Sequence, residues 1–294
     1  MNTNKRGRRT VRAAFARRLM SLALAAVMLW SLLPGLSPAA EAAEWMEPYL
    51  EKLVEWGVMQ GNASGNLNPD RVLTRAEFVT MINRAFGYTE RGSTPFQDVP
   101  ENAWYADDIN IAYQAGYFSG TSETTASPLG RVSREQAAVL LGRNLRLQGI
   151  AGVNSDFTDV YQMGNWSRGM VQECAELGII QGYADGTFRP KNYITRGQMA
   201  CFLVRALGTL VHETGEQVVG GVYGNLTVNT AGVKLKDTVV TGNLYLSGGV
   251  GLGNVELENV TVMGKIVVCG AGEAERGQSS IILRNVVADK MIVD

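Results

Sequence analysis

Three copies of one module dominate this sequence. In each copy a tryptophan is followed, 12, 16, 24 and 30 residues later, by Gly, Gly, Pro and Arg. The copies are Trp45, Gly57, Gly61, Pro69 and Arg75, then Trp104, Gly116, Gly120, Pro128 and Arg134, and then Trp166, Gly178, Gly182, Pro190 and Arg196. Because the copies differ at most other positions, composition cannot produce this register. The chain therefore contains one structural unit built three times.

Each module is predicted to be a helix, a loop and a second helix. Apolar residues follow each tryptophan at helical spacing, and the next glycine is typical of the residue that closes a helix. The apolar positions are Leu50, Leu53 and Val54 in the first copy, Ile109 and Ala112 in the second, and Met170, Cys174 and Leu177 in the third. A capping box starts the second helix in every copy. Its residues are Thr74 with Glu77, Ser133 with Gln136, and Thr195 with Gln198.

The arginine after each capping residue is not explained by capping. Arg75, Arg134 and Arg196 occupy the first helical position, where the helix dipole disfavours a cation by roughly 0.3–1 kcal/mol. Free amides and a guanidinium together suit a carboxylate or a phosphate. We therefore expect a site for an anionic ligand. The alternative is a salt bridge from each arginine to an acidic side chain of a neighbouring module.

The three copies resemble the S-layer homology modules that tether exported proteins to bacterial cell walls. The resemblance covers about residues 45–208 and is carried by residues 57–61, 74–77 and 178–190. It implies an α-helical, pseudo-threefold bundle of three helix-loop-helix modules, whose grooves bind an anionic secondary cell-wall polysaccharide, commonly pyruvylated. The implied binding residues are Arg75, Arg134, Arg196, Trp45, Trp104, Trp166, Gly61, Gly120 and Gly182. The alternative for the tryptophans is a place in the core.

Two departures from the repeat bear on how many grooves work. The second copy has Thr124 and Ala126 where the third has Gly186 and Phe188. The first copy lacks the Phe-x-Asp-Val sequence that stands at residues 96–99 and 157–160. We therefore expect fewer than three functional grooves.

The N-terminal residues predict export. Seven basic residues precede an apolar run at residues 19–33, and small residues follow, with cleavage expected after Ala42. The run is too short for a comfortable membrane span, so no span is expected after cleavage. Removal of residues 1–42 leaves 20 basic and 27 acidic residues, a net charge of −7. This balance argues against a nucleic-acid partner, and we expect a secreted protein at the bacterial cell wall.

The composition after residue 208 predicts an all-β segment. Short alternating strands recur every 18–22 residues, in the same order each time, with Gly or Asn at the corners. This pattern favours a parallel β-helix, or solenoid, over the alternative of a β-sandwich. Alternation places Leu226, Val228, Leu244 and Leu246 inward, with Thr227 and Tyr245 outward. Residues 270–280 are expected to form an exposed corner loop.

The last strand-like residues predict an open sheet edge, which invites further pairing. We expect the natural protein to continue beyond Asp294; the alternative is self-association through this edge. The predicted organisation is thus multidomain: a signal peptide (1–42), three modules (43–88, 96–148 and 157–208), a linker (209–217) and an incomplete β-helix-like segment (218–294).

Little in the sequence indicates catalysis or a cofactor. The only histidine, His212, lies in the linker, so the modules hold no Ser-His-Asp site. Cys174, Cys201 and Cys269 lack metal-ligand spacing, although a disulfide between the first two is conceivable. We expect a non-enzymatic wall anchor without metal or cofactor. The alternatives are the anchor of a longer wall-bound enzyme and a self-assembling S-layer subunit.

Overall fold

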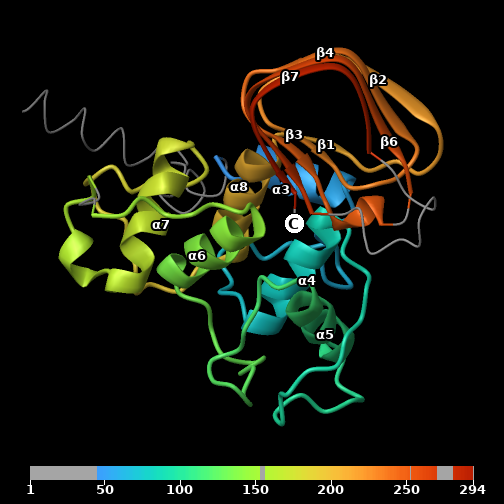
Figure 1. Cartoon of the computed structure of the whole chain (residues 1–294). Coiled ribbons are helices and arrows are strands. Elements are labelled where there is room, and N and C mark those ends of the chain that lie inside the picture. The colour runs from blue at the N-terminus through green and yellow to red at the C-terminus, as the bar shows by residue number, and fades with distance from the viewer. Residues whose placement is uncertain (1–44, 153–155, 252, 270–280, 294) are drawn as a thin grey trace, which may run out of the picture. The chain divides into compact units, whose positions relative to one another are not determined.

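The computed structural model describes residues 45–152, 156–251, 253–269 and 281–293. Met46–Asp294 forms one compact unit. The predicted signal peptide and the predicted corner loop at residues 270–280 lie outside the described residues. Over the described part of the chain, six α-helices precede seven β-strands. The helices and the strands occupy separate parts of the ribbon (Figure 1).

The helices come in three consecutive pairs, one pair for each module. They are α3 (Glu47–Glu55) and α4 (Arg75–Phe86), α5 (Ala106–Gln114) and α6 (Arg134–Asn144), and α7 (Asn165–Glu176) and α8 (Arg196–Leu207). A short 3₁₀ turn, η1 (Val160–Gln162), precedes α7. The helix-loop-helix prediction is confirmed. No helix among the described residues is both long and apolar enough to cross a membrane.

Local sequence signals set the helix ends as predicted. Gly57, Gly116 and Gly178 follow the first helices with φ of 68°, 76° and 69°, the left-handed conformation that costs glycine little. All three predicted capping boxes form at the starts of α4, α6 and α8. Of the apolar residues at helical spacing, Val54 and Leu177 have exposed side chains. The buried stripe is therefore narrower than the apolar spacing suggested in the first and third modules, but not in α5, where Ile109 and Ala112 are fully buried.

Backbone hydrogen bonds join the three modules in a closed cycle just before their second helices. The Leu73 amide donates to the Ile194 carbonyl, the Ile194 amide to Val132, and the Val132 amide to Leu73, over 3.0, 2.9 and 3.3 Å. All three side chains are fully buried. Each module thus contacts both others through equivalent residues. Because the cycle is closed, no module lies at an end of the arrangement.

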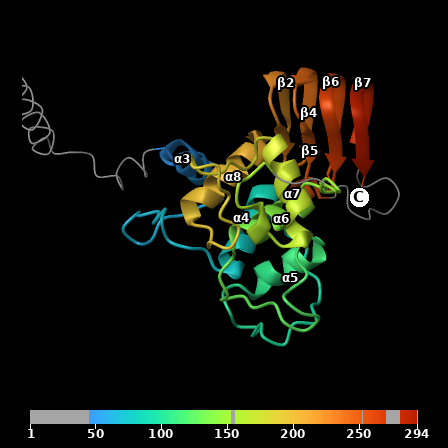
Figure 2. The ribbon, with the colours of Figure 1, turned by 90° about the vertical axis from the view of Figure 1, so that its left-hand side faces the viewer.

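The strands form one parallel, nearly closed sheet that winds like a solenoid. They are β1 (Thr209–Val211), β2 (Gln217–Tyr223), β3 (Leu226–Val228), β4 (Val233–Val240), β5 (Leu244–Leu246), β6 (Val255–Val268) and β7 (Ile281–Val293). One ladder runs β2-β4-β6-β7, and a second runs β1-β3-β5-β6-β7. Figure 2 shows the strands of the first ladder side by side, in the order β2, β4, β6 and β7. Since every pairing among these strands is parallel, the β-sandwich alternative is wrong.

The register confirms the repeat that the sequence predicted. Leu226 pairs with Leu244, and Leu244 pairs with Ile266, so equivalent residues stack one coil apart. The side chains of Leu226, Val228, Leu244 and Leu246 are fully buried inside the coil, as predicted. Of the residues expected to form a linker, 209–211 form strand β1.

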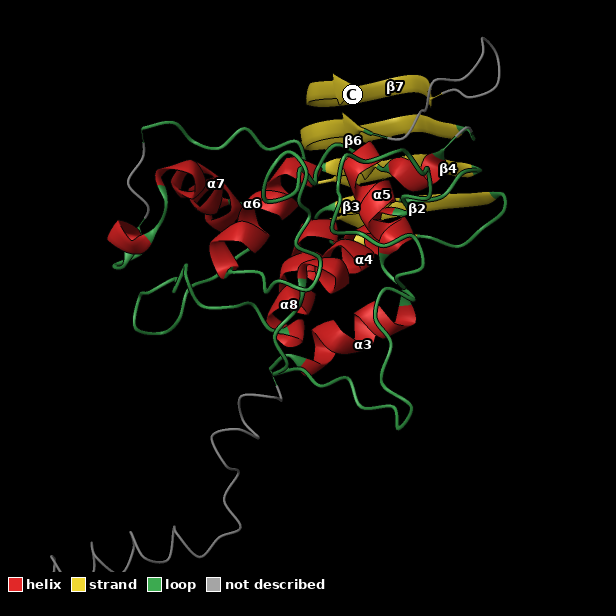
Figure 3. Ribbon diagram, turned by 90° about the horizontal axis from the view of Figure 1, so that it is seen from below, coloured by secondary structure: helices red, strands yellow, loops and turns green. Residues whose placement is uncertain are grey.

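Thr227 and Tyr245 lie on the outer face of the second ladder, as predicted, but this face is buried and not exposed to solvent. Thr227 Oγ1 donates to the Leu207 carbonyl at the end of α8, and Tyr245 belongs to the same hydrophobic cluster as the helices. Ser247 Oγ likewise donates to the Phe86 carbonyl at the end of α4. The helical modules therefore cover this side of the coil, so both faces of β3 and β5 are buried. Figure 3 shows the same arrangement from below.

Candidate functional site

The three repeated arginines link each module to the next one. Each is the first residue of the second helix of its module. Its Nε donates to a backbone carbonyl in the loop of the next module, where the first module counts as next after the third. Arg75 reaches the carbonyl of Ala126 at 2.8 Å, Arg134 that of Phe188 at 2.8 Å, and Arg196 that of Leu67 at 2.7 Å. The third module thereby contacts the first, so these contacts also run in a closed cycle.

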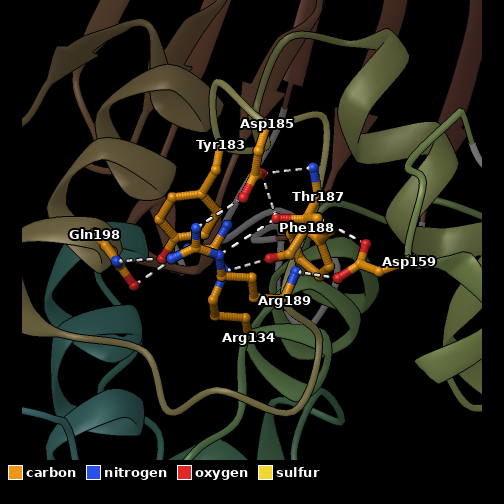
Figure 4. Close-up of polar contacts among 8 residues, drawn as sticks. All are labelled: Arg134, Asp159, Tyr183, Asp185, Thr187, Phe188, Arg189 and Gln198. Atoms are coloured by element: carbon orange, nitrogen blue, oxygen red, sulfur yellow. Dashed lines mark hydrogen bonds and ion pairs between the residues drawn. The ribbon is translucent and has the colours of Figure 1, made fainter.

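Arg134 has the most extensive surroundings of the three. Its terminal nitrogens donate to the Gln181 carbonyl at 3.2 Å and to Gln198 Oε1 at 3.1 Å. Its guanidinium carbon lies 4.7 Å from the ring centre of Phe188 and 5.0 Å from that of Tyr183, within the range of cation–π contacts. Figure 4 shows this cluster. A long cation is thus held by carbonyls and aromatic faces.

No salt bridge to any of the three arginines occurs within the described ranges. The alternative of acidic partners in neighbouring modules is therefore wrong, because backbone carbonyls take that place. Arg75 and Arg134 are buried, whereas Arg196 is half-buried. Among the described residues, no carboxylate is in direct contact with these three guanidinium groups.

Burial lowers the pKa of all three arginines, and neighbouring charges modify this shift differently. For Arg75, the nearby Asp98 raises the pKa in part. For Arg196, burial is followed by repulsion from Arg71, which lowers the pKa further, while Glu77 raises it. A lowered pKa means that the local surroundings disfavour the cation.

The loop glycines are required by close backbone packing. A Cβ atom on Gly61 would stand 2.6 Å from the backbone of Gly65. At Gly120 and Gly182 a Cβ would stand 2.6 Å from the rings of Phe96 and Phe157, respectively. These glycines allow the close packing of their loops. Their role in a binding groove would therefore be to shape it.

Two aspartates that sequence reasoning did not assign hold the loops in place. The Asp98 carboxylate accepts the amides of Ala126 and Ser127 at 2.8 and 2.7 Å. Asp159 accepts those of Phe188 and Arg189 at the same distances. Each aspartate thus fixes the loop whose carbonyl receives an arginine. The signal was present in the sequence, since both belong to the repeated Phe-x-Asp-Val element.

The loop of the second module has a different turn, as its sequence suggested. Gly65 and Gly186 both adopt φ of 77°, while Thr124 occupies the equivalent position in the second copy. There the turn is closed by reciprocal backbone hydrogen bonds between Ser122 and Thr125. The loop that faces Arg75 is consequently unlike the other two.

The module tryptophans lie at the surface. The exposed fractions of Trp45, Trp104 and Trp166 are 49%, 63% and 57%, so the alternative of a core position is wrong for all three. A surface pocket of about 450 Å³ lies beside Trp166, lined by residues 148–152 and by the start of α7. None of the three repeated arginines lines this pocket.

The cysteines and the histidine form no recognisable reactive site. Cys174 and Cys201 are buried, separate thiols, so the conceivable disulfide between them is not formed. Burial raises the pKa of these thiols to about 12 and about 11. His212 Nε2 lies 3.6 Å from Glu213, its neighbour in the chain. No cluster of His, Cys, Asp and Glu in the described residues has the form of a metal site.

Comparison with known proteins assigns the repeated modules. The family model described as "S-layer homology domain" matches residues 40–79, 95–138 and 156–200. The chain therefore carries three S-layer homology domains. The domains mediate cell-wall anchoring of S-layer proteins and of enzymes.

Curated relatives agree with this assignment. The Surface-layer 125 kDa protein of Lysinibacillus sphaericus is 33% identical over 161 residues, which is 54% of this chain and 14% of that protein. The Amylopullulanase of Thermoanaerobacterium thermosulfurigenes is 30% identical over 54% of this chain and 9% of its own length. The Middle cell wall protein of Brevibacillus brevis is 25% identical over 85% of this chain. The chain spans no more than a quarter of the length of these relatives. The predicted localisation at the bacterial cell surface is confirmed.

Proposed function

We propose that the three modules anchor an exported protein to the bacterial cell wall by binding an anionic, pyruvylated secondary cell-wall polysaccharide. The observation that carries this proposal is the cycle of arginines at the starts of α4, α6 and α8, none of which has a carboxylate partner within the described residues. A pyruvate ketal offers the carboxylate that such a site lacks. Helix N-termini add amide dipoles of the matching sign.

We further infer that the modules are arranged as a pseudo-threefold bundle, with one groove between each pair of consecutive copies. The repeated backbone contacts and arginine contacts support this arrangement, since each has an equivalent in all three copies. The groove between the first and second copies contains Arg75, the next contains Arg134, and the third contains Arg196. We call them groove 1–2, groove 2–3 and groove 3–1.

The grooves differ in charge, and groove 3–1 suits an anion best. Arg196 is the most accessible of the three arginines. Arg71 lies close enough to lower its pKa, although Glu77 pairs with Arg71. Groove 2–3 also has a second cation, Arg189, although Asp185 pairs with it at 2.9 Å. Groove 1–2 has Ser127 at the position of Arg189, together with its altered turn. We therefore propose that groove 1–2 contributes least to binding.

The exposed tryptophans fit a carbohydrate ligand, because an indole face packs well against sugar C–H groups. Trp104 and Trp166 expose more than half of their surface. We include these rings, and Trp45, in the proposed ligand set, with the loop glycines shaping the grooves.

We propose that this part of the protein binds and does not catalyse. The proposal keeps the predicted domain boundaries. These are a signal peptide at 1–42, modules at 43–88, 96–148 and 157–208, and the β-segment from 218. The similarity to an amylopullulanase over 9% of that enzyme favours one alternative, in which the chain is the anchor of a longer wall-bound enzyme. Sequencing the gene beyond the codon for Asp294 would distinguish a non-enzymatic wall protein from the anchor of a longer wall-bound enzyme.

Co-sedimentation with purified wall sacculi tests the proposal. We expect residues 43–294 to bind, and Arg196→Ala to weaken binding by about tenfold or more, as the loss of a charge-assisted hydrogen bond implies. Arg75→Ala should weaken binding less, and Arg143→Ala, on the exposed side of α6, should not change it. Circular dichroism confirms folding of each variant. If the folded wild-type protein does not bind untreated walls, the anchor function is wrong.

A further inference from the structure

The pocket beside Trp166 lies between the third module and the linker that precedes it. Residues 148–152 of the linker form one wall, and the first turns of α7 form the other. Its volume of about 450 Å³ lies within the range of roughly 300–1,000 Å³ that is typical of small-molecule sites. Because none of the repeated arginines lines it, this pocket is separate from the three arginine contacts.

The linker is fixed against α7 by two hydrogen bonds. The Ile150 amide donates to the Gly169 carbonyl at 3.1 Å, and the Gly149 amide donates to the Glu173 carboxylate at 2.6 Å. Gly169 permits this close approach, because a Cβ atom there would stand 2.6 Å from the Ile150 carbonyl oxygen. The two walls of the pocket are therefore held at a set distance before any ligand arrives.

The residues that form the pocket depart from the repeat. Two residues after its tryptophan, the third module has Arg168, where the first has Glu47 and the second has Ala106. The next residue is Gly169, where the other two copies have proline and aspartate. In sequence, only the third module combines a cation with the glycine that admits the linker. The repeated arginines do not account for this combination.

Arg168 brings a positive charge to the pocket. Its Nη2 donates to the Met163 carbonyl over 3.4 Å, a long hydrogen bond, and within the described ranges no carboxylate pairs with it. A guanidinium has five N–H donors, so its terminal nitrogens keep donors for a ligand. A carboxylate or a hydroxyl group is the acceptor that suits them.

Trp166 supplies an apolar face beside this cation. Its exposed fraction is 57%, and its ring lies so close to the Gly164 backbone that a Cβ atom on this glycine would overlap the indole Nε1. The ring is therefore held in place although it is exposed. An aromatic face next to a few hydrogen-bonding groups matches a sugar unit, which has C–H groups on its faces and hydroxyl groups at its edge.

We propose that this pocket binds one sugar unit of a wall carbohydrate, with Trp166 against its ring and Arg168 on its carboxylate or hydroxyl groups. The choice of a carbohydrate rests on the proposed wall anchoring. Two wall components carry such a unit, the secondary polymer and the glycan strands of peptidoglycan. A contact outside the arginine grooves adds to the retention of the protein, because linked sites act at a high effective concentration.

Isothermal titration calorimetry with two separate probes tests the pocket. The probes are the secondary polymer released from wall sacculi, and glycan strands freed of peptide by amidase digestion. We expect Arg168→Ala in residues 43–294 to weaken binding of at least one probe by about tenfold, as the loss of a charge-assisted hydrogen bond implies. Ala151→Phe, a pocket-lining position that is exposed on the linker, should fill the pocket and weaken binding of the same probe.

Two matched variants serve as controls. Arg143→Ala removes an exposed arginine from α6, and Ser93→Phe adds the same ring to the exposed linker between the first two modules. Both should bind as the wild type does, and circular dichroism checks that all four variants fold.

The outcomes separate this pocket from the arginine grooves. The probe whose binding weakens identifies the source of the sugar. Weakening in Arg168→Ala and Ala151→Phe but not in Arg196→Ala would support the pocket and contradict the proposed role of the grooves. Wild-type affinity of folded Arg168→Ala and Ala151→Phe for both probes would overturn the pocket and leave the groove proposal intact. Equal weakening in the controls, or a wild-type chain that binds neither probe, would also overturn it.

Discussion

The two halves of this chain use repetition in opposite ways. In the helical half the third module contacts the first, through the hydrogen bond from Arg196 to Leu67, so every copy has two neighbours. In the β half each coil pairs only with the coil before and after it, and among the described strands β7 pairs only with β6. The three modules therefore have equivalent neighbours, whereas the described coils have inner and outer positions in a row.

The largest expected difference lies between a central and a terminal coil of the stack. Leu257→Ala should lower the free energy of unfolding by about 3 kcal/mol, because a fully buried side chain leaves a cavity. Leu283→Ala, in the same column of β7, should cost less than about 1 kcal/mol, because this side chain is 44% exposed. Urea denaturation measures both. Equal losses would mean that the outer coil is covered as fully as the inner one.

In the helical modules, loss of a buried arginine that joins two modules should lower the free energy of unfolding by nearly as much. Arg134→Ala should lower the free energy of unfolding by about 2–3 kcal/mol, since it leaves buried carbonyls unsatisfied and removes packing on Phe188. Arg143→Ala, exposed on the same helix, should stay within about 0.5 kcal/mol of the wild type. Guanidinium denaturation of the two variants would distinguish an arginine that joins two modules from an ordinary surface cation.

The loop aspartates should have an intermediate effect. Asp159→Ala removes the acceptor of two backbone amides and should cost about 2 kcal/mol. Asp70→Ala, at an exposed loop position, serves as the control and should cause no resolvable loss. If thermal melts of the two variants coincide, Asp159 does not fix its loop.

The smallest effect concerns the buried thiols. Because burial raises the pKa of Cys174 to about 12, this thiol stays neutral in the folded protein when its unfolded counterpart ionises. The free energy of unfolding should therefore fall modestly as pH rises above the ordinary thiol value of 9.0. Cys174→Ala should remove that part of the pH dependence. At pH 8, alkylation should modify Cys174 only after denaturant is added, which mass spectrometry can follow.

Local rules made much of the fold predictable from sequence. The capping box at Thr74 and the closing glycine at Gly57 depend on neighbours within a few residues, and both were predicted correctly. Alternation identified the two faces of each strand, yet it could not tell which faces would be covered. Thr227 and Tyr245 were therefore placed outward, although helices α4 and α8 cover that side.

The environment of the arginines was less predictable for the same reason. Their acceptors are backbone carbonyls 51, 54 and 129 residues away in sequence. A backbone carbonyl carries no side-chain identity, so no residue pattern marks it in advance. The repeat did predict that the three arginines act alike. Differences in their charge surroundings, such as Arg71 beside Arg196, required the folded positions.

The most direct test of the proposed anchor is to remove the anion from the ligand while the protein stays unchanged. Residues 43–294 would be co-sedimented with native wall sacculi and with matched sacculi whose pyruvate ketals have been removed by mild acid. We predict strong binding to the native walls, at least about tenfold weaker binding to the treated walls, and loss of the difference in Arg196→Ala. Equal binding to both kinds of wall would contradict an anion-dependent anchor and would leave the three arginines as purely structural links between modules.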